Sequence, residues 1–271
     1  MVFQGHNAGR GPDDRRTAVV TGGSRGIGRA IAERLARDGC HVVINYSRRE
    51  DDARATVAAI ASAGGSAQAI RADIGDTDEI RTLFDTIGET RPRVDILVNS
   101  AARGLERPRD ALKALPKHLR HTVDVNVLGP WLCSQEAAKT MPRGGRIVNI
   151  SSLGAVRHAP RYAAVGVTKA ALEALTRYLA VELAPAGISV NTIRAGLVEG
   201  SEGIRLFPSN VADVLRARVP AGRNVQPEDV ANLVAFLCGP DAAMLCGQVI
   251  TLDGGFSLLG WDVRGDIEGW D

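Results

Sequence analysis

Short runs of β-branched and apolar residues alternate along the chain with longer stretches of helical periodicity. The strand candidates are TAVVT (17–21), HVVINY (41–46), SAQAIRA (66–72), VDILVN (94–99), GRIVNIS (145–151), ISVNTIR (188–194) and GQVITLD (247–253). Several of these runs are apolar at nearly every position, which is typical of strands buried on both faces of a sheet. The alternation predicts right-handed β-α-β crossovers and a doubly wound α/β sheet of about seven parallel strands flanked by helices.

The 271 residues contain no internal repeat and no obvious linker, so we expect a single domain. Residues 1–16 are rich in Gly, Asp and Arg without periodicity, and they are interpreted as a flexible N-terminal arm. The domain then runs over residues 17–259, and residues 260–271 form a C-terminal tail.

Composition narrows the classes of partner. A formal net charge of +2 gives no electrostatic reason to expect nucleic acid or an anionic membrane. No apolar run approaches the ~20 residues that a membrane helix requires, and no apolar leader opens the chain. We therefore expect a cytoplasmic protein.

Residue types that bind metals are scattered. The four cysteines are far apart in the sequence and form no C-x-x-C pair: Cys40, Cys133, Cys238 and Cys246. They are interpreted as reduced packing residues. His118 and His121 stand three positions apart without cysteine or carboxylate partners at ligand spacing, and they are interpreted as surface residues of a helix. No metal site is expected.

A glycine-rich segment, TGGSRGIG, joins the first predicted strand to the first predicted helix. Its glycines allow the backbone to turn tightly and approach a pyrophosphate, while the helix N-terminus offers free N–H groups and a positive dipole end. The alternative is a glycine-rich turn without a ligand, but the strand-to-helix context favours a dinucleotide site. The candidate cofactor residues of this loop are Gly22, Ser24, Arg25, Gly26, Ile27 and Gly28.

The end of the second predicted strand indicates which dinucleotide binds. NAD sites usually place an Asp or Glu there, whose carboxylate accepts a hydrogen bond from the ribose 2′-hydroxyl. Here Ser47 and Arg48 follow the strand, and no carboxylate appears before Glu50. A 2′-phosphate would meet a hydroxyl and guanidinium groups, with Arg25 approaching from the glycine loop. Although these arginines could simply begin a solvated helix, we expect NADPH or NADP+ as the cofactor.

Residues 17–259 resemble the short-chain dehydrogenase/reductase superfamily, whose members have a Rossmann-type fold. In that family an Asp-hydrophobic pair after the third strand meets the adenine, which implies this role for Asp73 and Ile74. Asn99, in NSAA, matches the first asparagine of the usual NNAG motif. Gly196, in VNTIRAGLVEG, matches the glycine of the usual PG pair. The resemblance therefore adds four expected cofactor residues.

The same resemblance assigns Asn126, in VDVNVLG, to the asparagine that holds a proton-relay water below the active-site lysine. The match is imperfect elsewhere. Ser100 and Ala102 depart from NNAG, Ala195 replaces the proline of the PG pair, and Gly200 replaces a threonine that follows it.

The segment YAAVGVTK places Tyr162 seven residues before Lys169. The chain has only 4 lysines, and this one lies on the predicted helix after the fifth strand, where reductases of this kind keep their active-site lysine. Seven helical residues turn the chain by about 700°, ~20° short of two turns, so both side chains should share a face about 10 Å apart along the axis. An ammonium group there can lower the pKa of a phenol. The alternative is an unrelated aromatic and a surface lysine.

Ser152 supports the first interpretation. It stands 17 residues before Lys169, the separation usual in the ketoreductases of the superfamily, so no deletion has changed the register. Val165 occupies the place of their tyrosine, four before the lysine. The tyrosine has therefore moved back by nearly one turn, to position 162.

The Tyr-x6-Lys spacing resembles that of the enoyl-acyl-carrier-protein reductases, and most closely the NADPH-dependent type III enzymes of bacteria. This resemblance covers residues 151–183, 220–223 and 247–259. It implies hydride transfer to C3 of a trans-2-enoyl thioester, in fatty-acid or related lipid metabolism. Acyl carrier protein is then a candidate partner, and a homotetramer is the expected assembly.

The enoyl reductases also imply residue roles. Tyr162 would stabilise the enolate oxygen, Lys169 would hold the nicotinamide ribose, and Ser152 would orient the substrate. A substrate loop over about residues 197–222 would cover an acyl channel.

Two other functions stay open. The first is an NADPH-dependent ketoreductase of polyketide or other secondary metabolism, because Ser152 and Asn126 are retained. The second is a catalytically silent NADPH-binding module. The combination of Tyr162, Ser152 and Lys169 favours an enzyme.

Overall fold

The computed structural model describes residues 15–105, 109–201, 203–204 and 209–259. The predicted C-terminal tail lies outside these residues, and so does the predicted N-terminal arm, apart from Arg15 and Arg16. Within the described part of the chain, no helix is long and apolar enough to cross a membrane.

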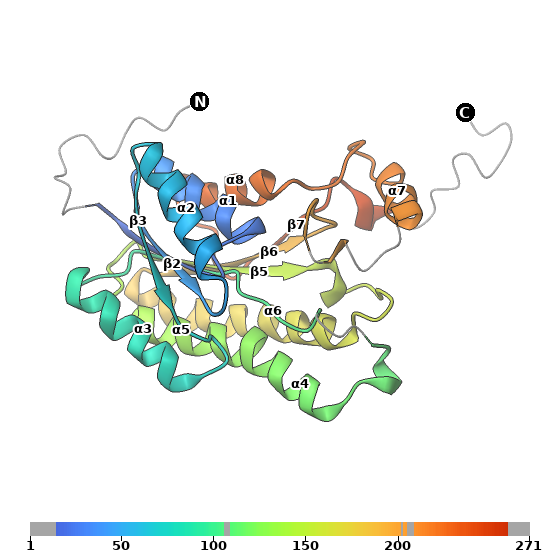
Figure 1. Ribbon diagram of the computed structural model, residues 1–271, viewed down its shortest axis with the longest axis horizontal. Coiled ribbons are helices and arrows are strands. Elements are labelled where there is room, and N and C mark those ends of the chain that lie inside the picture. The colour runs from blue at the N-terminus through green and yellow to red at the C-terminus, as the bar shows by residue number, and fades with distance from the viewer. Residues whose placement is uncertain (1–14, 106–108, 202, 205–208, 260–271) are drawn as a thin grey trace, which may run out of the picture.

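A seven-stranded sheet forms the centre of the molecule, with the strand order β3-β2-β1-β4-β5-β6-β7 and parallel pairing throughout (Figure 1). The strands are β1 Thr17–Thr21, β2 His41–Tyr46, β3 Ser66–Arg71, β4 Ile96–Asn99, β5 Arg146–Ser152, β6 Ser189–Ala195 and β7 Val249–Leu252. The single-domain Rossmann-type α/β fold with seven parallel strands is therefore confirmed.

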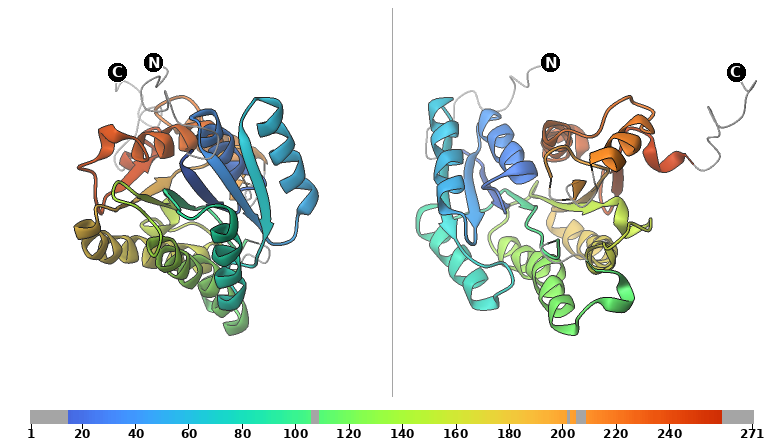
Figure 2. Two further views of the ribbon diagram at one scale, coloured as in Figure 1. Left: turned by 90° about the vertical axis from the view of Figure 1, so that its left-hand side faces the viewer. Right: turned by 45° about the vertical axis from the view of Figure 1, so that its right-hand side comes forward.

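Helices cover both faces of the sheet (Figures 1 and 2). They are α1 Gly26–Arg37, α2 Glu50–Ser62, α3 Thr77–Thr90, α4 Pro116–Val123, α5 Gly129–Ala138, α6 Ala163–Leu183, α7 Ser209–Ala217 and α8 Pro227–Leu237. Helices α1, α2 and α8 lie on one face, whereas α3, α5 and α6 lie on the other.

The strand sequences explain this sandwich of layers. In β1, Ala18 and Val20 belong to the apolar cluster beneath α1 and α8, while Val19 belongs to the cluster above α5 and α6. All three are fully buried, because successive side chains of a strand point to opposite faces of the sheet. A strand buried on both faces is therefore apolar at most of its positions.

Helix α3 shows how local sequence sets the helix boundaries. The Asp76 side chain accepts two backbone N–H groups of the first turn, at 2.9 and 3.0 Å, and so caps the helix. Its buried residues, Ile80, Leu83, Phe84 and Ile87, follow the i, i+3, i+4, i+7 spacing of one helix face.

The cysteines lie within this packing. Cys40, Cys133 and Cys238 are buried free thiols, and burial raises their pKa values to about 11, about 12 and about 12. Among the described residues, no group of three His, Cys, Asp or Glu side chains could hold a metal ion.

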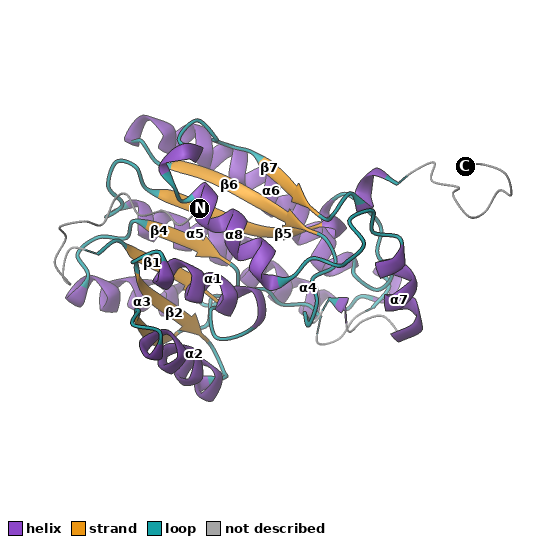
Figure 3. Ribbon diagram, turned by 90° about the horizontal axis from the view of Figure 1, so that it is seen from above, coloured by secondary structure: helices purple, strands orange, loops and turns teal. Residues whose placement is uncertain are grey.

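The strand order reverses between β1 and β4, and in open α/β sheets ligands bind at the carboxyl ends of the strands beside such a reversal (Figure 3). The predicted substrate loop, 197–222, runs from the end of β6 to α8 and contains α7; its residues 202 and 205–208 lie outside the described residues. The end of this loop packs on the turn after β7, where the Ala221 N–H donates to the Gly254 carbonyl at 3.0 Å.

Candidate active site

The glycine loop after β1 is built for close backbone approach. Gly22 has φ +65°, and a Cβ at this position would lie 2.9 Å from the Cα of Ala101. A Cβ on Gly28 would lie 2.2 Å from the carbonyl oxygen of Gly22, so α1 can begin this close to the loop only with glycine there. The open side of the loop is at Gly26, where a Cβ would meet nothing within 4 Å.

Two polar side chains that sequence reasoning missed hold this loop in place. Asn45 is buried at the end of β2, where its Oδ1 accepts from the Gly22 N–H at 3.4 Å and its Nδ2 donates to the Ala72 carbonyl at 2.9 Å. Thr21 Oγ1 accepts from the N–H groups of Ser100 and Ala101, at 3.0 and 3.1 Å. These bonds join the ends of β1, β2 and β4 into one rigid surface.

The residues predicted to select the cofactor stand at the rim of this surface. Ser24 is buried in the loop, and its carbonyl accepts from Thr56 Oγ1 at 3.0 Å. Arg25 and Arg48 are exposed, and Ser47 is half-buried. The neighbouring Arg49 instead faces Asp52, 3.6 Å away.

The other expected cofactor residues lie at the ends of β3, β4 and β6. Asp73 is half-buried and accepts from the Gly75 N–H at 2.9 Å through Oδ1. Ile74 is buried in the apolar cluster on the α5 side of the sheet. Gly196 follows β6, and its N–H donates to the Leu252 carbonyl at 2.8 Å.

Asn99 ends β4 in a buried polar position. Its Nδ2 donates to Asn149 Oδ1 at 2.8 Å, whereas its Oδ1 is buried and has no hydrogen-bond partner among the described residues. A buried oxygen without a partner is costly unless a ligand or water completes it. Asn99 is therefore suited to accept from a bound group at the end of β4.

The seven-residue spacing predicts two turns of one helix that includes Tyr162. In the structure Tyr162 instead lies at the N-cap of α6. Its φ and ψ are −108° and 4°, and the helix begins at Ala163. Arg161 explains the difference, because its φ of +57° is left-handed and cannot continue an α-helix backwards. The Tyr162 carbonyl still accepts from the Gly166 N–H at 2.8 Å, which fixes the tyrosine on the first turn.

The ring of Tyr162 packs on Gly154, where a Cβ would lie 2.5 Å from two ring carbons. The side chains of Tyr162 and Ser152 form a hydrogen bond, so two of the predicted catalytic residues meet. Burial raises the pKa of Tyr162, and the Ser152 bond opposes this increase only in part. The phenol is consequently neutral near pH 7 and can donate a hydrogen bond.

Lys169 lies about two turns along α6 from Tyr162, and its side chain reaches β5. Its Nζ donates to the carbonyl of Ile150 at 2.7 Å, two residues before Ser152. The side chain is buried, and the loss of solvation lowers its pKa from 10.5 to about 8. The structure thus brings Ser152, Tyr162 and Lys169 together at the carboxyl end of β5.

Val165, at the position of the usual tyrosine, is a packing residue. Only 2% of it is exposed. It faces the loop after β4, where a Cβ on Gly104 would lie 2.9 Å from methyl groups of both Val165 and Thr122.

Asn126 lies in a π-helical turn, Asp124–Leu128, a distortion that often marks functional sites. Its Oδ1 accepts from the Arg103 N–H at 2.8 Å, and its Nδ2 donates to the Arg103 carbonyl at 2.9 Å and to Thr168 Oγ1 at 3.0 Å. Asn126 therefore ties the β4–α4 loop to α6, directly beside Lys169.

Residues 22–257 match the model of a family described as "Enoyl-(Acyl carrier protein) reductase". The chain belongs to the short-chain dehydrogenase/reductase superfamily.

Relatives in this superfamily differ in their reactions. The chain is 39% identical over 252 residues to 1-cyclohexenylcarbonyl-CoA reductase of Streptomyces collinus, covering 91% of this chain and 89% of the relative. It is 36% identical over 247 residues to a 3-oxoacyl-[acyl-carrier-protein] reductase of a Synechocystis species, covering 90% and 98%. Among solved structures, it resembles a Burkholderia cenocepacia short-chain dehydrogenase in complex with NADP, with a TM-score of 0.82, 38% identity and coverage of 90% and 98%.

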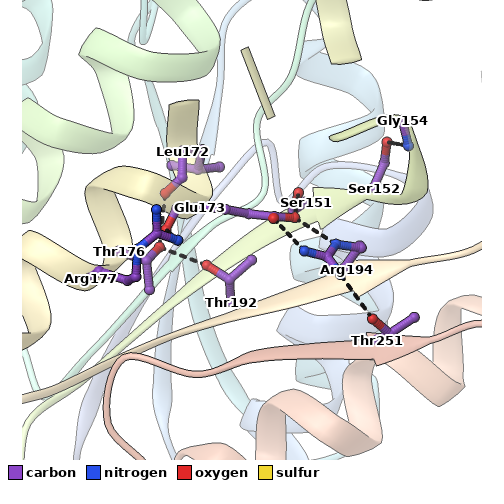
Figure 4. A network of polar contacts seen from close by, with 10 residues as sticks. All are labelled: Ser151, Ser152, Gly154, Leu172, Glu173, Thr176, Arg177, Thr192, Arg194 and Thr251. Carbon is purple, nitrogen blue, oxygen red and sulfur yellow. Dashed lines mark hydrogen bonds and ion pairs between the residues drawn. The ribbon is translucent and has the colours of Figure 1, made fainter. Parts of the chain in front are cut away.

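In this short-chain dehydrogenase/reductase, a largely buried ion pair braces β5, the strand that carries the candidate residue Ser152 (Figure 4). Glu173, one turn beyond Lys169 on α6, accepts from Ser151 Oγ at 2.7 Å and from two Arg194 nitrogens at 2.9 and 2.5 Å. Arg194 also donates to Thr251 Oγ1 at 3.2 Å, so β5, β6, β7 and α6 are linked. The hydrogen bonds to the Glu173 carboxylate raise the pKa of Arg194.

A second close contact fixes the start of α6 against the turn after β5. A Cβ on Gly166 would lie 2.5 Å from the Gly154 carbonyl oxygen, so α6 approaches the turn after β5 as closely as backbones permit. The two glycines stand twelve residues apart in the sequence, and neither was predicted as a site residue. The sequence signal that could have indicated this close approach is the pair of glycines that flank Tyr162.

Tyr162 lines a cavity of about 180 Å³ together with Gly154, Gly166 and Arg161. Arg161 also lines a larger cavity beside α4. His118 and His121 are on α4, as expected, but they line this larger cavity instead of merely facing solvent.

Proposed function

We propose that this chain is an NADPH-dependent reductase of the C2=C3 double bond of trans-2-enoyl thioesters. The observation that supports it most is the placement of the phenol. Tyr162 meets Ser152 from the N-cap of α6, while the usual tyrosine position is filled by buried Val165. The relative named 1-cyclohexenylcarbonyl-CoA reductase and the description of the matched family support the same class of reaction.

The residues fit an NADP cofactor. The open face at Gly26 and the N-terminus of α1 suit a pyrophosphate, and Asn99 has a buried oxygen without a described partner. Arg25 and Arg48 at the rim suit a 2′-phosphate. When bound, NADPH supplies the hydride that adds to C3 of the enoyl group. Lys169 would hold the nicotinamide ribose.

Tyr162 would act on the charge that develops at the other end of the enoyl system. Hydride addition at C3 places negative charge on the thioester oxygen, and a neutral phenol aimed at that oxygen donates to it. Ser152 orients the phenol through their hydrogen bond. Lys169, whose pKa is about 8, can carry positive charge near the site or release a proton when C2 is protonated.

Ketone reduction is the second candidate. The Ser152–Tyr162 hydrogen bond is also what a reductase needs to polarise a ketone and protonate an alkoxide, and some relatives are named 3-oxoacyl-[acyl-carrier-protein] reductases. A silent binding module remains a weaker third possibility, because Ser152, Tyr162 and Lys169 converge.

Crotonyl and acetoacetyl thioesters, each as the coenzyme A and the pantetheine form, separate these functions when NADPH oxidation is followed. We expect kcat/KM for each crotonyl thioester to be at least about tenfold higher than for the corresponding acetoacetyl thioester. This ratio corresponds to ~1.4 kcal/mol of additional transition-state stabilisation. Reduction of the acetoacetyl thioesters alone would show a ketoreductase. Reduction of neither substrate, despite NADPH binding, would favour the binding module.

Replacing Arg48 with glutamine should raise the KM for NADPH by about 10- to 100-fold, the value of one charge-assisted hydrogen bond to phosphate. The KM for NADH should change little, since NADH lacks the 2′-phosphate. Arg49→Gln is the matched control because Arg49 already faces Asp52. Equal effects of the two substitutions on NADPH would contradict a specific role for Arg48.

We also propose self-association and a cytoplasmic location. Val167, Tyr178 and Val181 lie on one exposed face of α6, with exposed fractions of 65%, 69% and 75%. Leu128 and Trp131, just before and within α5, are 45% and 44% exposed. Exposed apolar side chains such as these favour contact with further copies of the chain, in line with the homotetramer expected from the superfamily. Acyl carrier protein remains a candidate carrier of the substrate.

A further inference from the structure

A strongly basic cavity of about 430 Å³ lies between α4 and the N-terminus of α6. Six of its lining residues have basic side chains: Arg103, Arg109, Lys117, His118, His121 and Arg161. No Asp or Glu is found among its described lining residues. This concentration is unusual in a chain whose formal net charge is only +2.

Among the residues that the structure describes, part of this charge has no ion-pair partner. Arg109, Lys117 and His121 form no ion pair with another described residue. Asp110, which follows Arg109 in the sequence, lies 4.0 Å from Lys113 and lines the smaller cavity instead. The basic cavity is therefore suited to an anion that comes from outside the protein.

Arg161 connects this cavity to the reacting groups. It lines both cavities and directly precedes Tyr162. Its φ of +57° makes it the one non-glycine residue with positive φ in the described part of the chain. For an arginine this conformation is unfavourable, and such strain clusters where a ligand site needs it.

The neighbouring contacts fix the inner wall of the cavity. The Asn126 side chain forms hydrogen bonds with both the backbone N–H and the backbone carbonyl of Arg103, and it also donates to Thr168 Oγ1 on α6. Leu115, at the N-cap of α4, and Leu119, within α4, add apolar surface to the lining. A ligand with both an apolar arm and several negative charges would match these walls.

We propose that this cavity is a subsite for the phosphate groups of a pantetheine-linked acyl thioester, with coenzyme A as the carrier that its charge favours. The inference rests on the proposed function, since it names the carrier end of that substrate. Guanidinium and ammonium groups bind phosphate oxygens well, and several cations around one cavity suit several phosphates better than one carboxylate. The single phosphate of a carrier protein's phosphopantetheine arm offers the same chemistry.

Three crotonyl thioesters distinguish the sources of the phosphate: pantetheine without phosphate, 4′-phosphopantetheine with one, and coenzyme A. At saturating NADPH we expect kcat/KM to be about tenfold or more higher for coenzyme A than for pantetheine, mainly through KM. An intermediate value for 4′-phosphopantetheine assigns the cavity to the nucleotide end of coenzyme A. Equal values for both phosphorylated forms assign it to the pantetheine phosphate, and equal values for all three forms overturn the proposal.

Lys117→Gln tests the cavity itself, and Arg120→Gln is its control because Arg120 is exposed on the same helix but outside the lining. Lys117→Gln should reduce the preference for coenzyme A over pantetheine about tenfold, while Arg120→Gln should leave that preference unchanged. The KM for NADPH, measured in both variants, shows whether the cofactor's own phosphates are affected. Equal preferences in Lys117→Gln and the wild type overturn the proposal.

Direct binding separates this proposal from the proposed function. Coenzyme A is titrated calorimetrically into the wild type and Lys117→Gln with NADP+ at saturation, so that the dinucleotide site is filled. Binding that weakens about tenfold in Lys117→Gln supports the subsite even if no crotonyl thioester is reduced, in which case only the proposed function fails. Unchanged binding in Lys117→Gln overturns the subsite even if the enoyl substrates are reduced.

Discussion

Replacing Tyr162 with phenylalanine is expected to lower kcat for an enoyl thioester by about 100- to 1000-fold, the usual effect of removing one donor to a developing oxyanion. The phenol is the group that the structure holds against Ser152, and its raised pKa keeps the proton on the oxygen at neutral pH. The KM for NADPH should stay within about threefold of the wild-type value, because the oxyanion donor contributes to the transition state and not to cofactor binding.

Tyr178→Phe is the matched control for this substitution. Tyr178 lies on the same helix but is 69% exposed, so the same loss of a hydroxyl should leave kcat unchanged. Steady-state and single-turnover NADPH oxidation measure both variants. A Tyr162→Phe enzyme with nearly wild-type kcat would show that another group stabilises the enolate.

Replacing Lys169 with methionine should have opposite effects on activity and stability. We expect kcat/KM to fall by about 100-fold or more, because the site loses its ammonium group and proton donor. The free energy of unfolding at pH 7 should instead increase by about 1–3 kcal/mol. The gain arises because the wild type must hold a charged lysine away from solvent. The fall of the Lys169 pKa from 10.5 to about 8 corresponds to a cost of ~3 kcal/mol. The loss of the hydrogen bond to the Ile150 carbonyl reduces the gain by about 1 kcal/mol.

This stability difference depends on pH in a defined direction. The folded pKa is about 8 and the ordinary value 10.5, so below pH 8 Lys169 is charged in both states and its cost is complete. As the pH rises from 8 to 10.5, the folded state releases this proton first, the wild type gains stability relative to Lys169→Met, and the difference between them narrows.

Chemical denaturation of both proteins without added cofactor at pH 7 and pH 10 measures the difference. Lys139→Met serves as the control, since Lys139 is exposed and its loss should give a small difference at both pH values. A stability difference for Lys169→Met that does not change with pH would contradict the lowered pKa.

The strands and the spacing of the candidate catalytic residues could be predicted from the sequence because both are local properties. Parallel strands covered on both faces favour short runs rich in apolar and β-branched residues, so the seven segments indicated the seven strands within two residues at each end. Ser152, Tyr162 and Lys169 could be found by counting, because a fixed register along one strand and one helix brings them together.

The remainder of the site depends on contacts between distant segments. Asn45 looked like a strand residue, and its bonds to Gly22 and Ala72 follow only from the pairing of β2 with β1 on one side and β3 on the other. The left-handed conformation of Arg161, which moves Tyr162 to the N-cap, has no signature in a non-glycine residue. The basic cavity joins residues between 103 and 164, and only the packing of α4 near α6 brings these residues together.

The contact between Val165 and Gly104 limits how this enzyme can change during evolution. A tyrosine returned to position 165 would have to enter a space where even a methyl group on Gly104 would collide with Val165 and Thr122. Overpacking of this kind costs about 1–3 kcal/mol, so no single substitution would recover the shorter spacing without loss. Moving the phenol back to position 165 would therefore require a change in the loop after β4 as well as in the helix, because the loop and the helix are packed against each other at Gly104.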